Sequence, residues 1–86
     1  MSAAERFDEQ DDELFYLGRL AAELRMAIRE CLMSGRPQFA VALDTARDFA
    51  EAVLVESHPK STRIGVARAR AEIALEVWRE ARDVRH

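Results

Sequence analysis

The spacing of apolar side chains in residues 14–33 predicts an amphipathic helix with two apolar faces. One face repeats every three or four residues, as in a helix that packs into its own domain; it consists of Leu14, Leu17, Leu20, Ala21, Leu24, Ala27, Ile28, Cys31 and Leu32. At about 100° per residue, a second line falls on nearly the opposite side, and it consists of Phe15, Ala22, Met26 and Met33. A second apolar line predicts a second contact. Either another molecule packs against it, or the third helix of the domain does, which would place the first helix in the middle of a flat row of three helices.

The turn that follows this helix is marked clearly in the sequence. Gly35 suits the position just after a helix, and Pro37 suits the first position of the next one. We therefore predict a firm helix over residues 8–34 followed by a tight turn, with residues 1–7 frayed. The capping-box pattern of Ser2–Glu5 also allows a start at the beginning of the chain.

Two further helices are predicted, over residues 37–57 and over 61–84, with residues 85–86 frayed. Pro59 separates them, because proline stops a helix and restricts the residue before it. The predicted inward face of the second helix consists of Phe39, Ala42, Leu43, Ala46, Phe49, Ala50, Val53 and Leu54. That of the third consists of Val66, Ala67, Ile73, Ala74, Val77, Trp78, Ala81 and Val84.

These elements predict an all-α fold: a single domain over residues 1–86, built as a three-helix up-down-up bundle. No segment alternates apolar and polar residues as a strand does. Fifteen of the 86 residues are alanine, and alanine contributes little buried area. We therefore expect self-association to complete the bundle. Cys31, the single cysteine, excludes an intrachain disulfide, and its spacing predicts a buried, reduced thiol.

Charge is segregated along the chain, although the net charge is only −3. Six acids and one arginine give residues 1–13 a charge of −5, whereas four cations and no acid give residues 59–70 a charge of +4. The cations form a candidate anion or nucleic-acid contact and are Lys60, Arg63, Arg68 and Arg70. The net charge gives no general argument for nucleic acid or an anionic membrane, and we favour a solvated face or a contact with the acidic end of a neighbouring chain.

Arg70 has an unusual place in the pattern, because it falls within the predicted apolar face of the third helix. An unpaired guanidinium is costly in a dry core. Two interpretations follow. The side chain either extends to the surface or pairs with an acid, or it holds an anionic ligand.

Catalytic and metal-binding patterns are absent from the sequence. The acids of residues 8–13 lack the glycine and distal glutamate of a calcium loop, and His58 and His86 do not have the spacing of helical ligands. We read Trp78 and the Phe39/Phe49 pair as packing residues. No apolar run suggests a signal peptide or a membrane span. We therefore expect a cytoplasmic, non-enzymatic protein without a metal or cofactor.

The second apolar line of the first helix is the strongest candidate site. Arginines flank it as rim residues flank an interface, and the predicted partner-binding residues are Phe15, Arg19, Ala22, Met26, Arg29 and Met33. These residues predict a protein-interaction module, such as an adaptor, inhibitor or regulator, that forms a homodimer and possesses a surface for a different protein. The alternatives are a nucleic-acid-binding regulator that uses residues 60–70, and a ligand sensor or enzyme that uses Arg70.

Overall fold

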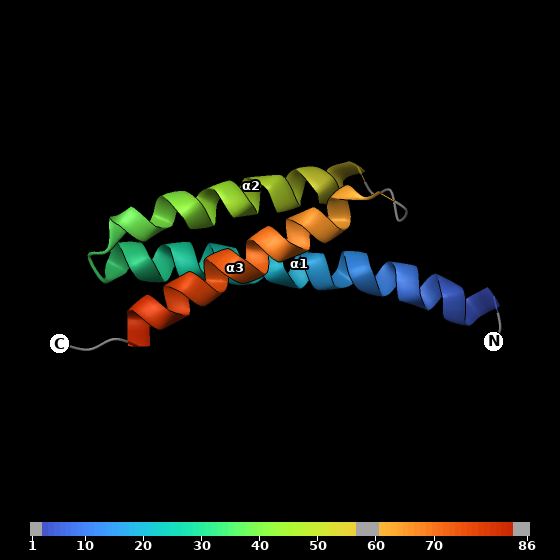
Figure 1. The fold of residues 1–86 in the computed structure, drawn as a ribbon, viewed down its shortest axis with the longest axis horizontal. Helices are drawn as coiled ribbons and strands as arrows, with labels where there is room; N and C mark the ends of the chain where they lie inside the picture. Colours follow the sequence, from blue (N-terminus) through green and yellow to red (C-terminus); the bar gives the residue numbers. More distant parts are fainter. Residues whose placement is uncertain (1–2, 57–60, 84–86) are drawn as a thin grey trace.

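Three helices pack against one another in the computed structural model, which describes residues 3–56 and 61–83 and, within them, the side chains from residue 13 onward. The elements are α1 (Ala3–Met33), the short 3₁₀ helix η1 (Pro37–Phe39), α2 (Ala40–Glu56) and α3 (Arg63–Asp83). α2 runs back along α1, and α3 returns in the direction of α1 (Figure 1). The described ranges contain no strand. The predicted all-α, three-helix up-down-up bundle is confirmed.

Helix bounds differ from the predicted ones mainly at the ends. α1 begins at Ala3, close to the start that the capping-box pattern allows. The predicted second helix is divided, because its first turn is the 3₁₀ helix η1 and the α-helix begins at Ala40. α3 begins at Arg63, whose backbone N–H donates to the Ser61 hydroxyl at 3.2 Å. Predicted end positions 57 and 84 lie outside the described residues.

The turn between α1 and α2 has the geometry that its glycine predicts. Gly35 adopts a φ of 76°, a left-handed conformation that glycine adopts without the penalty of a Cβ. The backbone N–H of Arg36 donates to the carbonyl of Cys31 at 2.8 Å, and that of Gly35 donates to Leu32 at 3.3 Å. These two bonds are the Schellman pattern of a helix C-terminus, so the predicted end of the first helix is confirmed.

The core forms two neighbouring clusters to which all three helices contribute. The larger consists of Leu20, Leu24, Ala27, Cys31, Leu43, Ala46, Ala71, Leu75 and Trp78. The smaller consists of Leu17, Ala21, Ala50, Val53, Ile64 and Ala67. The rings of Phe39 and Trp78 pack at 5.5 Å between centroids with a tilt of 55°, which closes the larger cluster. Seven of these fifteen core residues are alanine or cysteine, so the core is as thin as the composition predicts.

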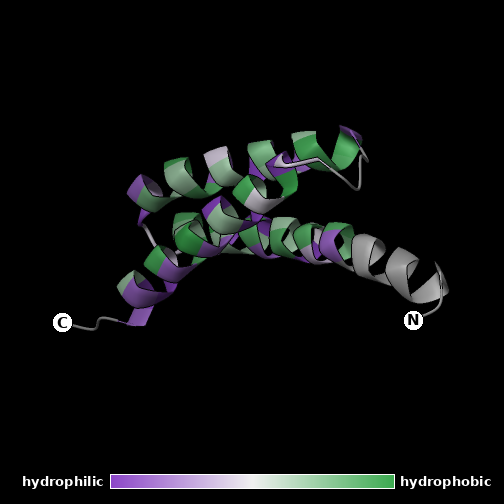
Figure 2. Ribbon diagram, turned by 45° about the vertical axis from the view of Figure 1, so that its right-hand side comes forward, coloured by the Kyte–Doolittle hydropathy of each residue, from purple (hydrophilic) through white to green (hydrophobic). Residues whose placement is uncertain are grey.

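The inward face that we predicted for α3 is partly wrong. The buried residues of α3 are Ile64, Ala67, Ala71, Leu75 and Trp78, whereas Val66, Ile73 and Val77 are exposed. α3 carries two adjacent apolar lines, and the prediction merged them. Smaller corrections apply to Ala42 of α2 and Leu32 of α1, which are also exposed. Towards its C-terminal end α3 becomes strongly hydrophilic (Figure 2).

The first turns of α1 extend past the ends of α2 and α3 (Figure 1). α1 has 31 residues, against 17 in α2, which at 1.5 Å per residue corresponds to about 46 Å against about 26 Å. Leu14 is the first described side chain of α1 that packs on the core, at the edge of the smaller cluster. The backbone of α1 is therefore longer than the part of the helix whose described side chains pack on the core.

Candidate interaction surface on α1

From residue 13 onward, the face of α1 opposite the core is open to solvent. Phe15, Met26 and Met33 are 69%, 72% and 82% exposed, and Arg19, Ala22 and Arg29 between them are also exposed. We call these six residues the outer stripe. Leu17 and Leu24, on the opposite side of α1, are fully buried. Both α2 and α3 pack on that inner side, so the third helix does not cover the outer stripe.

Polar pairs tie α1 to both neighbouring helices and border the outer stripe. Towards α2, the Nε atom of Arg25 donates to Glu51 at 2.8 Å. Towards α3, the pairs and their distances are Tyr16–Glu72 at 3.0 Å, Glu30–Arg82 at 3.0 Å and Glu23–Arg79 at 3.7 Å. The hydrogen bond from the Tyr16 hydroxyl to Glu72 raises the pKa of Tyr16, with a further contribution from desolvation. The apolar side chains of the stripe therefore lie between two polar borders.

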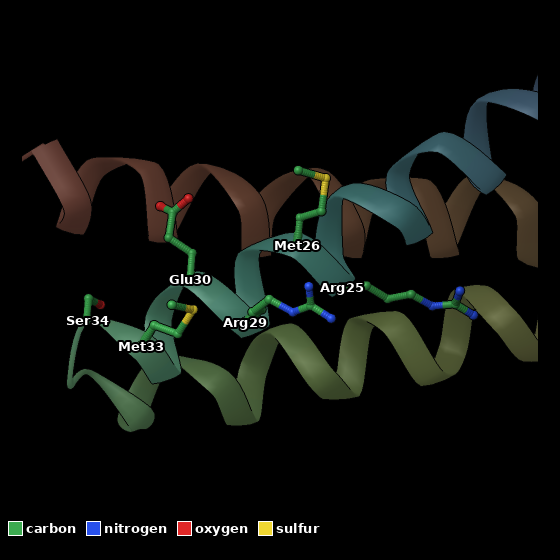
Figure 3. A pocket seen from close by; sticks show the side chains of 6 residues that line it. All are labelled: Arg25, Met26, Arg29, Glu30, Met33 and Ser34. Atoms are coloured by element: carbon green, nitrogen blue, oxygen red, sulfur yellow. The ribbon is translucent and has the colours of Figure 1, made fainter.

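A shallow hollow of about 620 Å³ occupies the C-terminal part of this surface. Figure 3 shows the side chains that line it, all from α1 or the turn after it: Arg25, Met26, Arg29, Glu30, Met33 and Ser34. Arg25 and Arg29 extend along the α2 side, whereas Glu30 and Met26 lie towards α3 (Figure 3). The hollow thus combines two thioethers with charges of both signs, which suits a protein side-chain surface.

The two arginines of the outer stripe have no ionic partner in the part of the chain that the structure describes. Neither Arg19 nor Arg29 forms an ion pair or a hydrogen bond with another described side chain. Arg25, one turn from Arg29, is by contrast paired with Glu51. The outer stripe therefore carries two exposed positive charges.

The candidate basic contact at the start of α3 is only partly assembled. Arg63 and Arg70 lie over the same ring, that of Phe49, with guanidinium carbons 5.2 Å and 4.8 Å from its centroid, and Arg63 also pairs with Glu56. Arg68 lies on another side of α3, where its charge acts on Tyr16 of α1. Lys60 lies outside the described residues. The structure brings Arg63 and Arg70 together but separates Arg68 from them.

Arg70 is exposed, which corrects its predicted place within the packed face of α3. It lies at one end of an apolar groove of about 390 Å³ between α2 and α3, lined by Ala42, Thr45, Ala46, Arg70, Ile73, Ala74 and Val77. The sequence did not predict this groove. The available signal was the spacing of Val66, Ile73 and Val77, which we had assigned to the core.

Cys31 is fully buried, as predicted. Its Sγ donates to the carbonyl of Ile28 at 3.2 Å, and burial raises the pKa of the thiol. Both features keep the sulfur protonated and unreactive, since the thiolate is the nucleophile.

Two further properties follow from the described parts of the chain alone. Residues 13–56 and 61–83 contain no group of three or more His, Cys, Asp or Glu side chains placed to hold a metal ion. No helix within the described residues has the length and hydrophobicity needed to cross a membrane.

Comparisons of the chain with protein-family models, with curated proteins and with solved structures found no match. Within the described residues, the outer stripe of α1 combines exposed apolar side chains with polar borders on both sides.

Proposed function

We propose that this chain is a non-enzymatic protein-interaction module that acts as a homodimer through the outer stripe of α1. The proposal rests on the exposure of Phe15, Met26 and Met33. These side chains lie on the side of α1 opposite the residues that pack in the core. A helix that has already packed its inner face gains nothing for its own fold from a second apolar line.

The chemistry of the outer stripe supports a protein partner. Protein interfaces combine an apolar centre with a polar border, and aromatic side chains often anchor them. Methionine adapts its shape to the surface that it meets, and Ala22 allows a close approach of two helices. The thin, alanine-rich core supports self-association, because small domains gain stability by burying further surface in an oligomer.

Light scattering coupled to gel filtration tests the proposal. The wild-type chain is expected to have twice its monomer mass, and the double variant Phe15→Glu, Met26→Glu is expected to be a folded monomer. The matched control is Ile73→Glu, Val77→Glu, which makes the same change in two exposed apolar residues of the α2–α3 groove. This control is expected to remain a dimer.

Other results of the same experiment would contradict the proposal. A monomeric wild type would remove self-association and leave the outer stripe to a different protein. A dimeric Phe15→Glu, Met26→Glu variant together with a monomeric Ile73→Glu, Val77→Glu variant would transfer the interface to the α2–α3 groove. Circular dichroism of each variant tests whether its helices remain folded.

We further propose a cytoplasmic location. The single, buried cysteine is compatible with a reducing compartment, and a homodimeric module of this kind needs no disulfide to hold it together. Localisation of a fluorescent fusion in the native cell checks this, and a signal confined outside the cytoplasm would contradict it.

A further inference from the structure

The positions of the outer stripe follow a regular alternation along α1. Its positions, 15, 19, 22, 26, 29 and 33, are separated by four and three residues in turn, and α1 is one continuous helix over all of them. This alternation is the seam of a coiled coil. The same spacing continues towards the N-terminus through positions 12, 8 and 5, at which the sequence carries Asp12, Asp8 and Glu5. The seam is therefore acidic at its N-terminal end, whereas its arginines lie at positions 19 and 29.

We infer that the occupant of the outer stripe is the same stripe of a second copy, antiparallel to the first, in one particular register. In this register Phe15 lies opposite the partner's Met26, and position 12 lies opposite the partner's Arg29. The two-fold axis passes between positions 20 and 21. The inference rests on the proposed homodimer and specifies how its two chains pair.

Charge disfavours the parallel arrangement of the two helices. In a parallel two-fold pair each seam position meets its own copy. Arg19 would then lie against the partner's Arg19, and Arg29 against the partner's Arg29. Like charges placed face to face disfavour an interface, and neither arginine has an ionic partner within the described part of its own chain.

Charge also separates the two antiparallel registers that cover most of the stripe. A shift of one heptad from the inferred register places Phe15 opposite the partner's Met33 and Ala22 opposite the partner's Met26. That shifted register pairs more apolar surface, but it also places Arg19 opposite the partner's Arg29, twice in each dimer. The inferred register instead pairs Arg29 with an aspartate position and Arg19 with the small Ala22. The two Arg19 residues then lie on either side of the two-fold axis, offset by about 4.5 Å along the helix, and neither lies directly opposite another arginine. It keeps an apolar contact between Phe15 and the partner's Met26.

The shape of the subunit provides a separate reason for the inferred register. The backbone of the first turns of α1 extends past the ends of α2 and α3 (Figure 1). In the inferred register these turns run along the C-terminal end of the partner's α1, with position 8 opposite the partner's Met33. That end carries the hollow lined by Met26, Arg29 and Met33. Each projecting end therefore covers the hollow of the other subunit.

A charge reversal at Arg29 distinguishes the registers by the sign of its effect. In the inferred register Arg29→Glu places two acids opposite each other, and we expect the dimer dissociation constant to rise about tenfold at low salt. The double variant Asp12→Lys, Arg29→Glu restores the opposite charges and is expected to recover most of the affinity. In the shifted register Arg29→Glu would lie opposite the partner's Arg19 and tighten the dimer. A tighter dimer would overturn the inference.

Disulfide trapping gives a second, independent test. Under mild oxidation we expect the variant Phe15→Cys, Met26→Cys to form a covalent dimer, whereas Phe15→Cys, Met33→Cys remains largely uncrosslinked. Positions 15 and 26 of one chain are about 16 Å apart along α1, too far for a bridge within the chain. The wild type, whose Cys31 is buried, is the uncrosslinked control.

The two proposals fail in different ways. Efficient crosslinking of Phe15→Cys, Met33→Cys alone would overturn the register while leaving the dimer intact. A wild type that stays monomeric in light scattering would instead overturn the homodimer itself, and the register with it.

Discussion

Leu24 and Met26 lie two residues apart on α1 and have opposite surroundings. Leu24 is fully buried in the larger core cluster, whereas Met26 is 72% exposed. Two residues turn an α-helix through about 200°, so the two side chains point away from each other. One helix thus packs on the core with one face and exposes the other to solvent. Substitutions on the two faces should therefore change different properties.

Alanine substitution at these two positions tests that division. Leu24→Ala is expected to lower the free energy of unfolding by about 2–5 kcal/mol, because it leaves a cavity in the core. Met26→Ala is expected to change the stability of the folded subunit by about 0.5 kcal/mol or less while weakening self-association. Urea unfolding at several protein concentrations separates the two effects. Equal losses at both positions, independent of concentration, would contradict the division.

The inner face of α1 could be predicted from the sequence because its large residues repeat at one helical spacing. Leu17, Leu20 and Leu24 leave little choice of side, and all three are buried. The buried face of α3 was harder to predict, because alanines on two adjacent sides of the helix are equally compatible with burial. There the contacts with α1 and α2 decide that Leu75 is buried and Ile73 exposed, and periodicity along one helix does not contain that information.

The candidate site shows the same limit. The spacing of Phe15 and Met26 places them on the side of α1 opposite the core and so predicts their exposure. The outer stripe could therefore be found in the sequence. The α2–α3 groove could not, because it depends on how two helices cross. The contact of Arg70 with Phe49 joins side chains from different helices, and it likewise requires the packed structure.

Two glycines allow a matched test of the turn after α1. Gly35 has a φ of 76°, so Gly35→Ala is expected to destabilise the fold by about 1 kcal/mol or more, because a Cβ disfavours the left-handed conformation. Gly65 lies in α3 with open space around its Cβ position, so Gly65→Ala is expected to stabilise the fold by up to about 1 kcal/mol. Thermal unfolding of both variants measures the difference. Changes of the same sign would contradict the assigned backbone conformations.

From the burial of the Cys31 thiol we expect the free energy of unfolding to depend on pH. Burial raises its pKa in the folded state, so the folded protein disfavours the thiolate. Near neutral pH the thiol is protonated in both the folded and the unfolded protein, so the ionisation of Cys31 does not yet lower the free energy of unfolding. As the pH rises through the ordinary thiol range towards the raised pKa, Cys31 loses its proton first in the unfolded state. The free energy of unfolding therefore falls over this pH range.

Alkylation of the thiol measures the same property directly. In folded protein at pH 8, iodoacetamide is expected to modify Cys31 far more slowly than in protein unfolded in urea, because the buried sulfur is protonated and inaccessible. A Cys31→Ala variant is expected to lose the additional destabilisation at high pH while remaining folded. Rapid alkylation of the native protein would show that the sulfur is accessible and would contradict its burial.

The cations at Phe49 provide the test of the nucleic-acid alternative. Arg70 is exposed and lies over the Phe49 ring, so Arg70→Met is expected to leave the fold intact and to cost about 1 kcal/mol or less. Because Arg68 lies on a different side of α3 and Arg63 is paired with Glu56, we expect no retention of the wild type on duplex DNA at low salt. Retention that falls steeply with added salt and is lost in Arg70→Met would contradict this expectation. It would identify the Arg63–Arg70 side of α3 as a phosphate-binding surface separate from the outer stripe.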